Sequence, residues 1–200
     1  MRRYIPIFLV FITCGTMLET AKTANGINVG VGIGAYPWKI EEEKFGYTPP
    51  YLYLTGMFKY GVRATKKSPG VDLGYRVYIL GLSHKGLEYD LIENLALSSW
   101  DIKMQIPENP YMDFAFQIEF WGLSPVQFSL ILSKEAKRKV TPFFRTAIAY
   151  PGILRFTSGI STKIKRYTHF FLGGDIVFYF QEMKKTEKTG GLYIGFVWGL

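Results

Sequence analysis

The chain has 200 residues, which is enough for one domain and short for two. Aromatic residues make up 17% of it, and this favours strands over helices because flat or branched side chains pack well on a pleated surface. The formal net charge is +8, but the basic residues lie in short clusters between apolar segments. This distribution, together with the signal peptide predicted below for the first residues, argues against a nucleic-acid partner and favours a position beside anionic lipid.

The first residues predict a signal peptide. Arg2 and Arg3 form a charged start, residues 5–12 form an apolar core, and small residues follow at Thr13 and Gly15. This core is shorter than the roughly 20 residues that span a bilayer. We therefore expect residues 1–21 to be a signal peptide, with cleavage somewhere from 15 to 24, and residues 22–200 to form a single domain. A buried N-terminal strand or helix is the alternative interpretation.

The only cysteine, Cys14, lies at the end of this segment. Lipid attachment is one interpretation, but Phe11 and Thr13 are poor matches to the residues expected before a lipidated cysteine. If the segment is removed downstream of Cys14, the mature chain has no thiol. It then has no disulfide, no thiol catalysis and no cysteine metal site.

The rest of the chain has no apolar run of 18 residues, which argues against a transmembrane helix. Large apolar side chains instead alternate with small or polar ones, so that each segment has one apolar face as a strand. The pattern predicts ten strands, with eight possible if two merge or fail. They lie at about 27–34, 51–60, 71–80, 97–106, 112–120, 126–132, 143–150, 153–162, 168–180 and 192–200. The stretch 86–97 could be strand, loop or both.

Turn residues separate several of these segments. They occur at 68–70, 107–110, 150–152 and 189–191, and the last of these is Thr189-Gly190-Gly191. With both ends of the domain in the periplasm, connections 39–50, 82–96, 122–125, 150–152 and 181–191 would face outward.

The two faces of the strands differ in kind. A soluble barrel or sandwich has an apolar face in its core and a charged face in water. Here the second face is rich in Gly, Ser, Gln and Tyr, while Lys and Glu concentrate in the connections. This arrangement indicates lipid outside and a small polar lumen inside. Because backbone groups in hydrocarbon need internal partners, the first and last strands are expected to pair and close the ring. The expected fold is an all-β, closed, antiparallel, up-and-down transmembrane β-barrel.

Ten charged residues fall on the expected inner face, five basic and five acidic. They are Lys59, Asp72, Arg76, Asp101, Lys103, Asp113, Glu119, Arg145, Arg155 and Asp175. This balance is typical of a lumen filled by ion pairs, since unpaired charges there would be costly. We favour a plugged, rigid barrel, and a narrow channel lined by both signs is the alternative. Aromatic residues near strand ends predict interfacial anchors: Tyr36, Trp38, Tyr60, Trp100, Trp121, Tyr150, Tyr167 and Tyr179.

The last strand carries a resemblance. It reads Leu192-Tyr193-Ile194-Gly195-Phe196-Val197-Trp198-Gly199-Leu200. In this it resembles small bacterial outer-membrane β-barrel proteins, whose terminal strand is the signal for the barrel-assembly machinery. The resemblance implies that Leu192, Ile194, Phe196, Trp198 and Leu200 form this assembly signal. It departs at Leu200, where the family most often ends in Phe or Trp.

Two motifs suggest other chemistry. Residues 30–35 match G-x-G-x-x-A, but Pro37 follows where a dinucleotide site needs a helix. Ser83, His84 and His169 raise the possibility of a lipid A-modifying enzyme. Ser83 and His84 are neighbours that would point apart in an extended chain, and His169 is expected at the periplasmic level.

Overall we expect an exported protein of the outer membrane with a structural or binding role, or a narrow pore with a largely plugged lumen. The expected partners are outer-membrane lipids, lipopolysaccharide and, during biogenesis, the barrel-assembly machinery. No cofactor, metal or nucleic acid is expected. The alternatives are a lipid A-modifying enzyme and a soluble periplasmic barrel that binds an apolar ligand.

Overall fold

The computed structural model describes residues 18–40, 45–46, 51–83, 86–88, 98–121, 124–135, 139–149, 152–181 and 185–199. The regular structure in these ranges is entirely β. The strands are β1 (Gly26–Ile40), β2 (Phe45–Gly46), β3 (Tyr51–Val62), β4 (Gly70–Ser83), β5 (Gly86–Glu88), β6 (Ser99–Gln105), β7 (Asp113–Trp121), β8 (Ser124–Ser133), β9 (Val140–Ala149), β10 (Ile153–Lys165), β11 (Thr168–Gln181) and β12 (Lys185–Gly199). No helix in the described part of the chain is long and apolar enough to cross a membrane.

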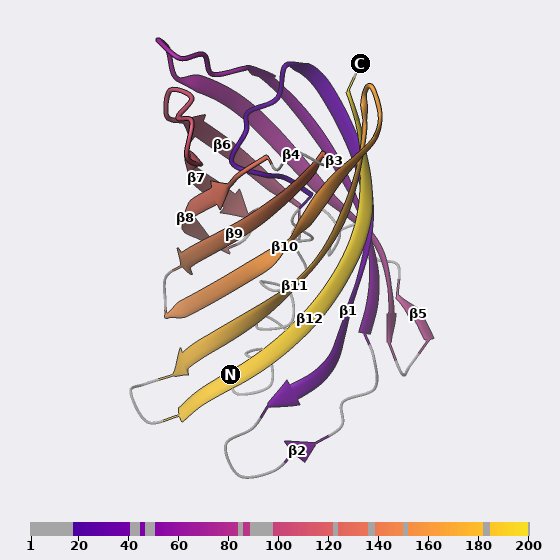
Figure 1. Ribbon diagram of the computed structural model, residues 1–200. Coiled ribbons are helices and arrows are strands. Elements are labelled where there is room, and N and C mark those ends of the chain that lie inside the picture. The colour runs from indigo at the N-terminus through magenta and orange to yellow at the C-terminus, as the bar shows by residue number, and fades with distance from the viewer. Residues whose placement is uncertain are drawn as a thin grey trace.

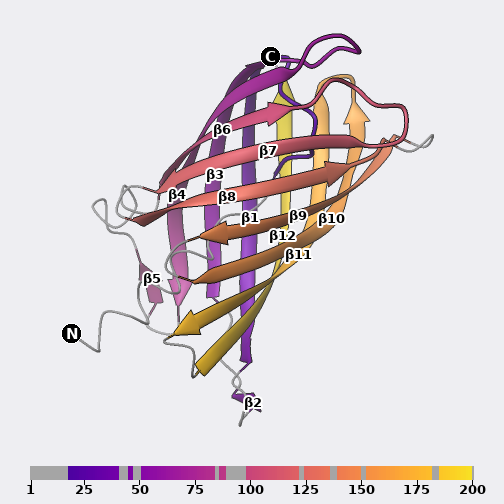
Figure 2. The ribbon, with the colours of Figure 1, turned by 90° about the vertical axis from the view of Figure 1, so that its left-hand side faces the viewer.

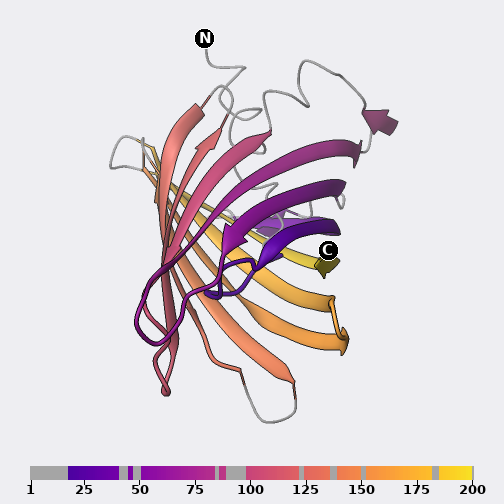
Figure 3. The same ribbon diagram turned by 90° about the horizontal axis from the view of Figure 1, so that it is seen from above.

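Ten long strands form a closed barrel. Each pairs antiparallel with its neighbours along the chain, and the short strands β2 and β5 add to the ends of β1 and β4. The first and last long strands also pair, with Val31 opposite Phe196 and Ile33 opposite Ile194. Figure 1 and Figure 3 show the strands curving around a common axis. The expected ten-stranded up-and-down barrel is therefore confirmed.

The alternation along each strand sets the two surfaces of the barrel. In β6, Ser99, Asp101 and Lys103 are buried, whereas Trp100, between the first two, is 64% exposed. The other long strands follow the same rule, so large apolar side chains cover the outside and polar side chains fill the inside. The apolar face points outward, as the composition of the two faces predicts.

The barrel has two distinct ends. At the first, which we call the proximal end, β1 begins, β12 ends, and turns join β3 to β4, β6 to β7, β8 to β9 and β10 to β11. At the opposite, distal end, β3, β6, β8, β10 and β12 begin. The turn at 68–70 is closed by the Thr65 amide, which donates to the Ser68 carbonyl at 2.9 Å. At the distal end, Gly152 has a φ of +111°, a conformation that side-chain-bearing residues rarely adopt.

One expected connection is wrong. Strand β12 begins at Lys185, so Thr189-Gly190-Gly191 is strand and not a turn. Gly190 pairs with Trp38 of β1 on one side and with Ile176 of β11 on the other. Because both neighbouring strands extend this far toward the distal end, the two glycines are held in the sheet despite their low strand propensity. The outward connection 181–191 is therefore shorter than expected. Tyr150 and Pro151 of the 150–152 turn, together with His84, lie outside the described residues.

Candidate functional site

The inner wall of the barrel carries the charged residues that the alternation singles out. All ten are buried, at 8% exposure or less. They are Lys59, Asp72, Arg76, Asp101, Lys103, Asp113, Glu119, Arg145, Arg155 and Asp175. They come from β3, β4, β6, β7, β9, β10 and β11, and they point inward because each occupies an inward position of its strand's two-residue period.

The interior also holds a piece of chain that is not part of the wall. Residues 18–24, here called the N-terminal segment, precede β1 and fold back into the barrel (Figures 1 and 2). Leu18 is 2% exposed and packs in an apolar cluster with wall residues that include Met57, Ile131 and Phe143. These partners come from β3, β8 and β9, so the segment contacts the wall on several sides.

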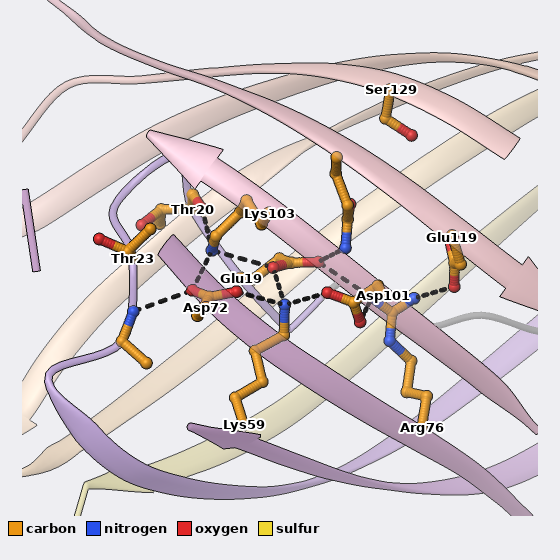
Figure 4. Close-up of polar contacts among 12 residues, drawn as sticks. Glu19, Thr20, Thr23, Lys59, Asp72, Arg76, Asp101, Lys103, Glu119 and Ser129 are labelled. Atoms are coloured by element: carbon orange, nitrogen blue, oxygen red, sulfur yellow. Dashed lines mark hydrogen bonds and ion pairs between the residues drawn. The ribbon is translucent and has the colours of Figure 1, made fainter. Parts of the chain in front are cut away.

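Glu19 is the centre of the charged site (Figure 4). Its carboxylate accepts from Arg76 Nη2 at 2.9 Å and from Lys103 Nζ at 3.0 Å. Gln117 donates to the same group at 2.8 Å, and Lys59 forms a further ion pair with it. Three cations from β3, β4 and β6 thus converge on one acid of the N-terminal segment, which is 4% exposed.

The network extends from Glu19 in two directions. Lys59 Nζ donates to Asp101 at 2.8 Å, and Lys103 lies 3.2 Å from Asp72. On the other side, the guanidinium of Arg76 pairs with Glu119 at 3.0 Å. Glu119 in turn accepts from Arg145 Nη2 at 2.8 Å.

The cluster is balanced in charge. Among the described residues it joins four cations, Lys59, Arg76, Lys103 and Arg145, to four acids, Glu19, Asp72, Asp101 and Glu119. A separate ion pair joins Arg155 of β10 to Asp175 of β11. Buried charges are tolerated when every one of them has a partner of opposite sign, and this arrangement provides those partners.

Three of these acids lie close enough together to be compared with a metal site. Carboxylate oxygens of Glu19, Asp72 and Asp101 lie within 4.8 Å of one another. The ammonium group of Lys59, however, forms ion pairs with all three. The positive charge that a cation would supply is therefore already present in the protein, and the cluster is an ion-pair network in this structure.

Backbone bonds fix the remainder of the N-terminal segment to the wall. The amide of Ala21 donates to Ser133 Oγ at 3.1 Å, and the amide of Thr23 donates to Gln105 Oε1 at 2.8 Å. The amide of Ala24 donates to Asp72 at 2.9 Å. These bonds satisfy buried donors that would otherwise be costly in the lumen.

The proximal end of the lumen is an open, basic cavity. It has a volume of about 570 Å³, and its lining includes Lys139, Lys163 and Arg166 beside the N-terminal segment. At its rim Lys22 Nζ donates to Glu135 at 2.6 Å. This hydrogen bond and the charge of Lys22 lower the pKa of Glu135 below its ordinary value.

The candidate catalytic residues lie apart from this network. His169 lies in the wall of the proximal cavity, where its Nδ1 is 3.5 Å from Ser161 Oγ. That distance is at the limit of a hydrogen bond and is long for a nucleophile and its base. His84 and the side chain of Ser83 are outside what the structure describes.

The residues of the expected assembly signal lie on the outer surface. Leu192, Ile194, Phe196 and Trp198 of β12 are all exposed, and Leu200 lies outside the described residues. On the inner face of the same strand Tyr193 and Val197 are buried. The strand therefore presents one continuous apolar stripe outward.

Glu19 is the one central residue that the sequence reasoning missed. The sequence pattern assigns it to the signal peptide, residues 1–21. The expected set of five acids contains Asp113 in its place. Asp113 lies near the proximal rim, where Lys22 is 4.0 Å away. The small residues Thr13 and Gly15, which permit cleavage before Glu19, are the sequence signal that could have identified it.

No protein-family model matches the chain, and no curated protein matches it in sequence. Among solved structures it is similar to Neisserial surface protein A (NspA), with a TM-score of 0.41 and 12% identity over 88% of this chain and 98% of that chain. It is also similar to Ail, the attachment invasion locus protein of Yersinia pestis, with a TM-score of 0.34 and 10% identity over 87% and 98%. A structure of Ail in complex with the heparin analogue sucrose octasulfate has a TM-score of 0.33 and 7% identity over 86% of this chain and 96% of that chain. The fold itself is established by the pairing of the chain's own strands.

Proposed function

We propose that this protein is an integral barrel of the bacterial outer membrane, with an occluded lumen and a structural or binding role. The observation that carries the proposal is the inverted arrangement of the ten long strands. Charged side chains are buried inside, whereas Phe116, Phe128 and Ile148 are between 51% and 61% exposed outside. An apolar exterior of this extent is expected of a surface that contacts lipid.

Closure of the ring supports the same location. The pairing of β1 with β12 leaves the long strands without an open edge. In hydrocarbon an open edge would leave backbone groups without partners, at a cost of several kcal/mol for each group. Aromatic side chains near the strand ends, such as Tyr60 and Tyr167 at the proximal end and Trp100 at the distal end, are exposed and suited to the two membrane interfaces.

Export and assembly belong to this proposal. The charged start and apolar core of residues 1–12 support export through a signal peptide. The outward stripe of β12 supports recognition by the barrel-assembly machinery. After insertion, the barrel would contact lipid and lipopolysaccharide through its apolar exterior.

Occlusion of the lumen follows from its contents. A barrel of eight strands has an interior just wide enough for the side chains that fill it, and a ring of ten strands leaves somewhat more room. Here the interior contains the four cations and four acids of the central network, the Arg155–Asp175 pair and the N-terminal segment. We therefore propose that the barrel does not conduct ions in its resting state.

A soluble barrel with an apolar ligand needs its aromatic faces inside. The outward position of Phe116 and the inward position of the charged network count against that alternative. A lipid A-modifying enzyme needs a nucleophile and base at the outer leaflet. The Ser–His contact among the described residues, Ser161 with His169 at 3.5 Å, lies at the proximal end, so no described contact favours this second alternative.

The test is extraction and gel mobility of the mature protein made in a Gram-negative cell. The proposal predicts that it fractionates with the outer membrane, requires detergent for extraction and migrates differently before and after boiling. Recovery of the folded protein in the soluble periplasmic fraction without detergent would contradict it.

A further inference from the structure

We infer that processing during export cuts the chain upstream of Leu18, so that the N-terminal segment remains in the mature barrel as a permanent internal plug. This inference rests on the proposed export of the protein. It goes further because it assigns a processing boundary and a role to residues 18–24. A boundary at residue 24 would remove the whole segment, and a boundary at residue 21 would remove most of it.

The segment packs closely against the wall at two glycines. A Cβ at Gly195 of β12 would lie 2.3 Å from Leu18 Cδ2 and 2.7 Å from the backbone oxygen of Val31. A Cβ at Gly70, where β4 begins, would lie 2.2 Å from Thr23 Oγ1 and 2.4 Å from the backbone nitrogen of Ala64. The backbone of the wall itself therefore favours glycine at both positions, and side chains of the segment fill the space beside them.

The charge of the wall requires the segment as well. Without Glu19, the central network would have four buried cations and three buried acids. Glu19 contacts three of those cations directly, and its loss would leave Lys59, Arg76 and Lys103 to share Asp72, Asp101 and Glu119. An uncompensated buried charge costs several kcal/mol. A mature chain that begins at Lys22 would therefore lack the acid around which its lumen is built.

The sequence offers a cleavage position that retains Glu19. Signal peptidases prefer small residues at the first and third positions before the cut. Gly15 and Thr13 satisfy both positions, whereas a cut after Ala21 would have Glu19 at the third position and a cut after Ala24 would have Lys22 there. Hydrolysis of the Gly15–Thr16 peptide bond by one water molecule would leave a carboxylate on Gly15 and a new amino group on Thr16.

The first experiment determines the mature N-terminus. The full-length gene is expressed, the protein is extracted from the outer membrane, and its intact mass is measured by mass spectrometry. The inference predicts a processed chain that begins at Leu18 or shortly before it, with Thr16 as the expected first residue. An uncut chain, or a chain that begins after Leu18, for example at Lys22 or Asn25, would overturn the inference. Membrane fractionation and the boiling-dependent gel shift of the same sample test the proposed function separately.

The second experiment tests whether the segment lies inside the folded barrel. Ala21→Cys and Asn25→Cys are made in the full-length chain, and each mature protein is labelled with a maleimide in detergent. Ala21 is fully buried and Asn25 is exposed. We expect Ala21→Cys to react at least about tenfold more slowly, because the segment must first open. Equal rates in samples that show the gel shift of a folded barrel would overturn the inference.

Ala21→Cys adds only a sulfur atom, and it is chosen for that reason. If it nevertheless disturbs folding, Thr23→Cys tests a second buried position, since Thr23 is 6% exposed. The cysteine side chain has nearly the same volume as the threonine side chain that it replaces. Boiled samples give the intrinsic labelling rate of each thiol. The ratio of folded to boiled rates therefore measures protection in the lumen and not the reactivity of the thiol.

Discussion

Glu19 is the residue on which the interior of this barrel depends. It ties Lys59, Arg76 and Lys103, which come from three strands, to a segment outside the sheet. Buried ion pairs do not by themselves make a protein more stable than apolar packing would, but removing one partner from such a pair is strongly destabilising. Substitution of Glu19 should therefore destabilise the barrel far more than substitution of an exposed carboxylate.

Glu19→Gln should lower the free energy of unfolding by about 3 kcal/mol, since it leaves a buried positive charge without compensation while preserving the shape of the side chain. The measurement is urea unfolding of protein refolded from residues 16–200 in lipid vesicles. Glu108→Gln is the matched control, because Glu108 pairs with Arg63 on the exposed proximal surface. Such a pair contributes less than about 1 kcal/mol. Equal effects of the two substitutions would show that Glu19 is not buried in the network.

The wall charges could be predicted from the sequence, whereas the plug could not. Alternation alone placed Lys59, Asp101 and Arg145 on the inner face, because a period of two residues fixes the side of every residue in a strand. Residues 18–24 carry no such period. Their place depends on tertiary contacts with Ser133, Gln105 and Asp72, which are distant in the sequence.

At the scale of the elements, the outward face of each strand determines where the barrel can reside. Phe116 lies near the middle of β7 and is 51% exposed. It pairs with Met104 of β6 and Leu130 of β8, which also point outward. The three side chains form part of one apolar belt that crosses neighbouring strands.

Phe116→Lys should destabilise the inserted barrel by about 2–4 kcal/mol, because it places a charge near the middle of the lipid-facing surface. Tyr111→Lys is the control, since Tyr111 is 76% exposed in the turn before β7 and a charge there remains in water. Reversible unfolding in vesicles gives both values. A neutral effect of Phe116→Lys would mean that this face does not contact hydrocarbon.

The register of β1 against β12 gives a direct test of closure. Ile33 and Ile194 are paired residues on the outer surface. In protein that lacks Cys14, the double variant Ile33→Cys with Ile194→Cys should form a disulfide under mild oxidation, because paired residues on the same face bring their Cβ atoms to about 5 Å. Intact and proteolysed samples are compared on non-reducing gels.

The control for this cross-link combines Ile33→Cys with Leu172→Cys. Leu172 pairs with Ile194 from the other side, so it lies one strand farther from Ile33. A strand spacing of nearly 5 Å separates successive strands, and this pair is therefore too distant to form a disulfide. Equal cross-linking of both pairs, or none in either, would contradict the closed register.

The positions of the elements followed closely from sequence, but their ends did not. The prediction of a turn at Thr189-Gly190-Gly191 rested on local residue types. The structure instead keeps these residues in β12, because β1 and β11 supply partners on both sides. Strand length in a barrel is set by neighbouring strands, which local sequence does not encode.

For the whole molecule, the two surfaces have opposite requirements and the sequence meets both. The exterior needs apolar side chains and a closed ring, and the interior needs a balanced set of charges. The fold class could be predicted because both requirements leave a period-two pattern along every strand. The contents of the lumen could be predicted only in part, because the N-terminal segment adds the fourth acid from outside that pattern.

Single-channel recording tests the central claim, a membrane barrel with an occluded lumen, most directly. The mature protein, verified as folded by its boiling-dependent gel shift, is reconstituted into a planar bilayer at moderate salt. The account predicts a silent baseline, because the ion-pair network and the N-terminal segment occupy the interior. Discrete, reproducible conductance steps from this protein would contradict it and would show an open path past Glu19.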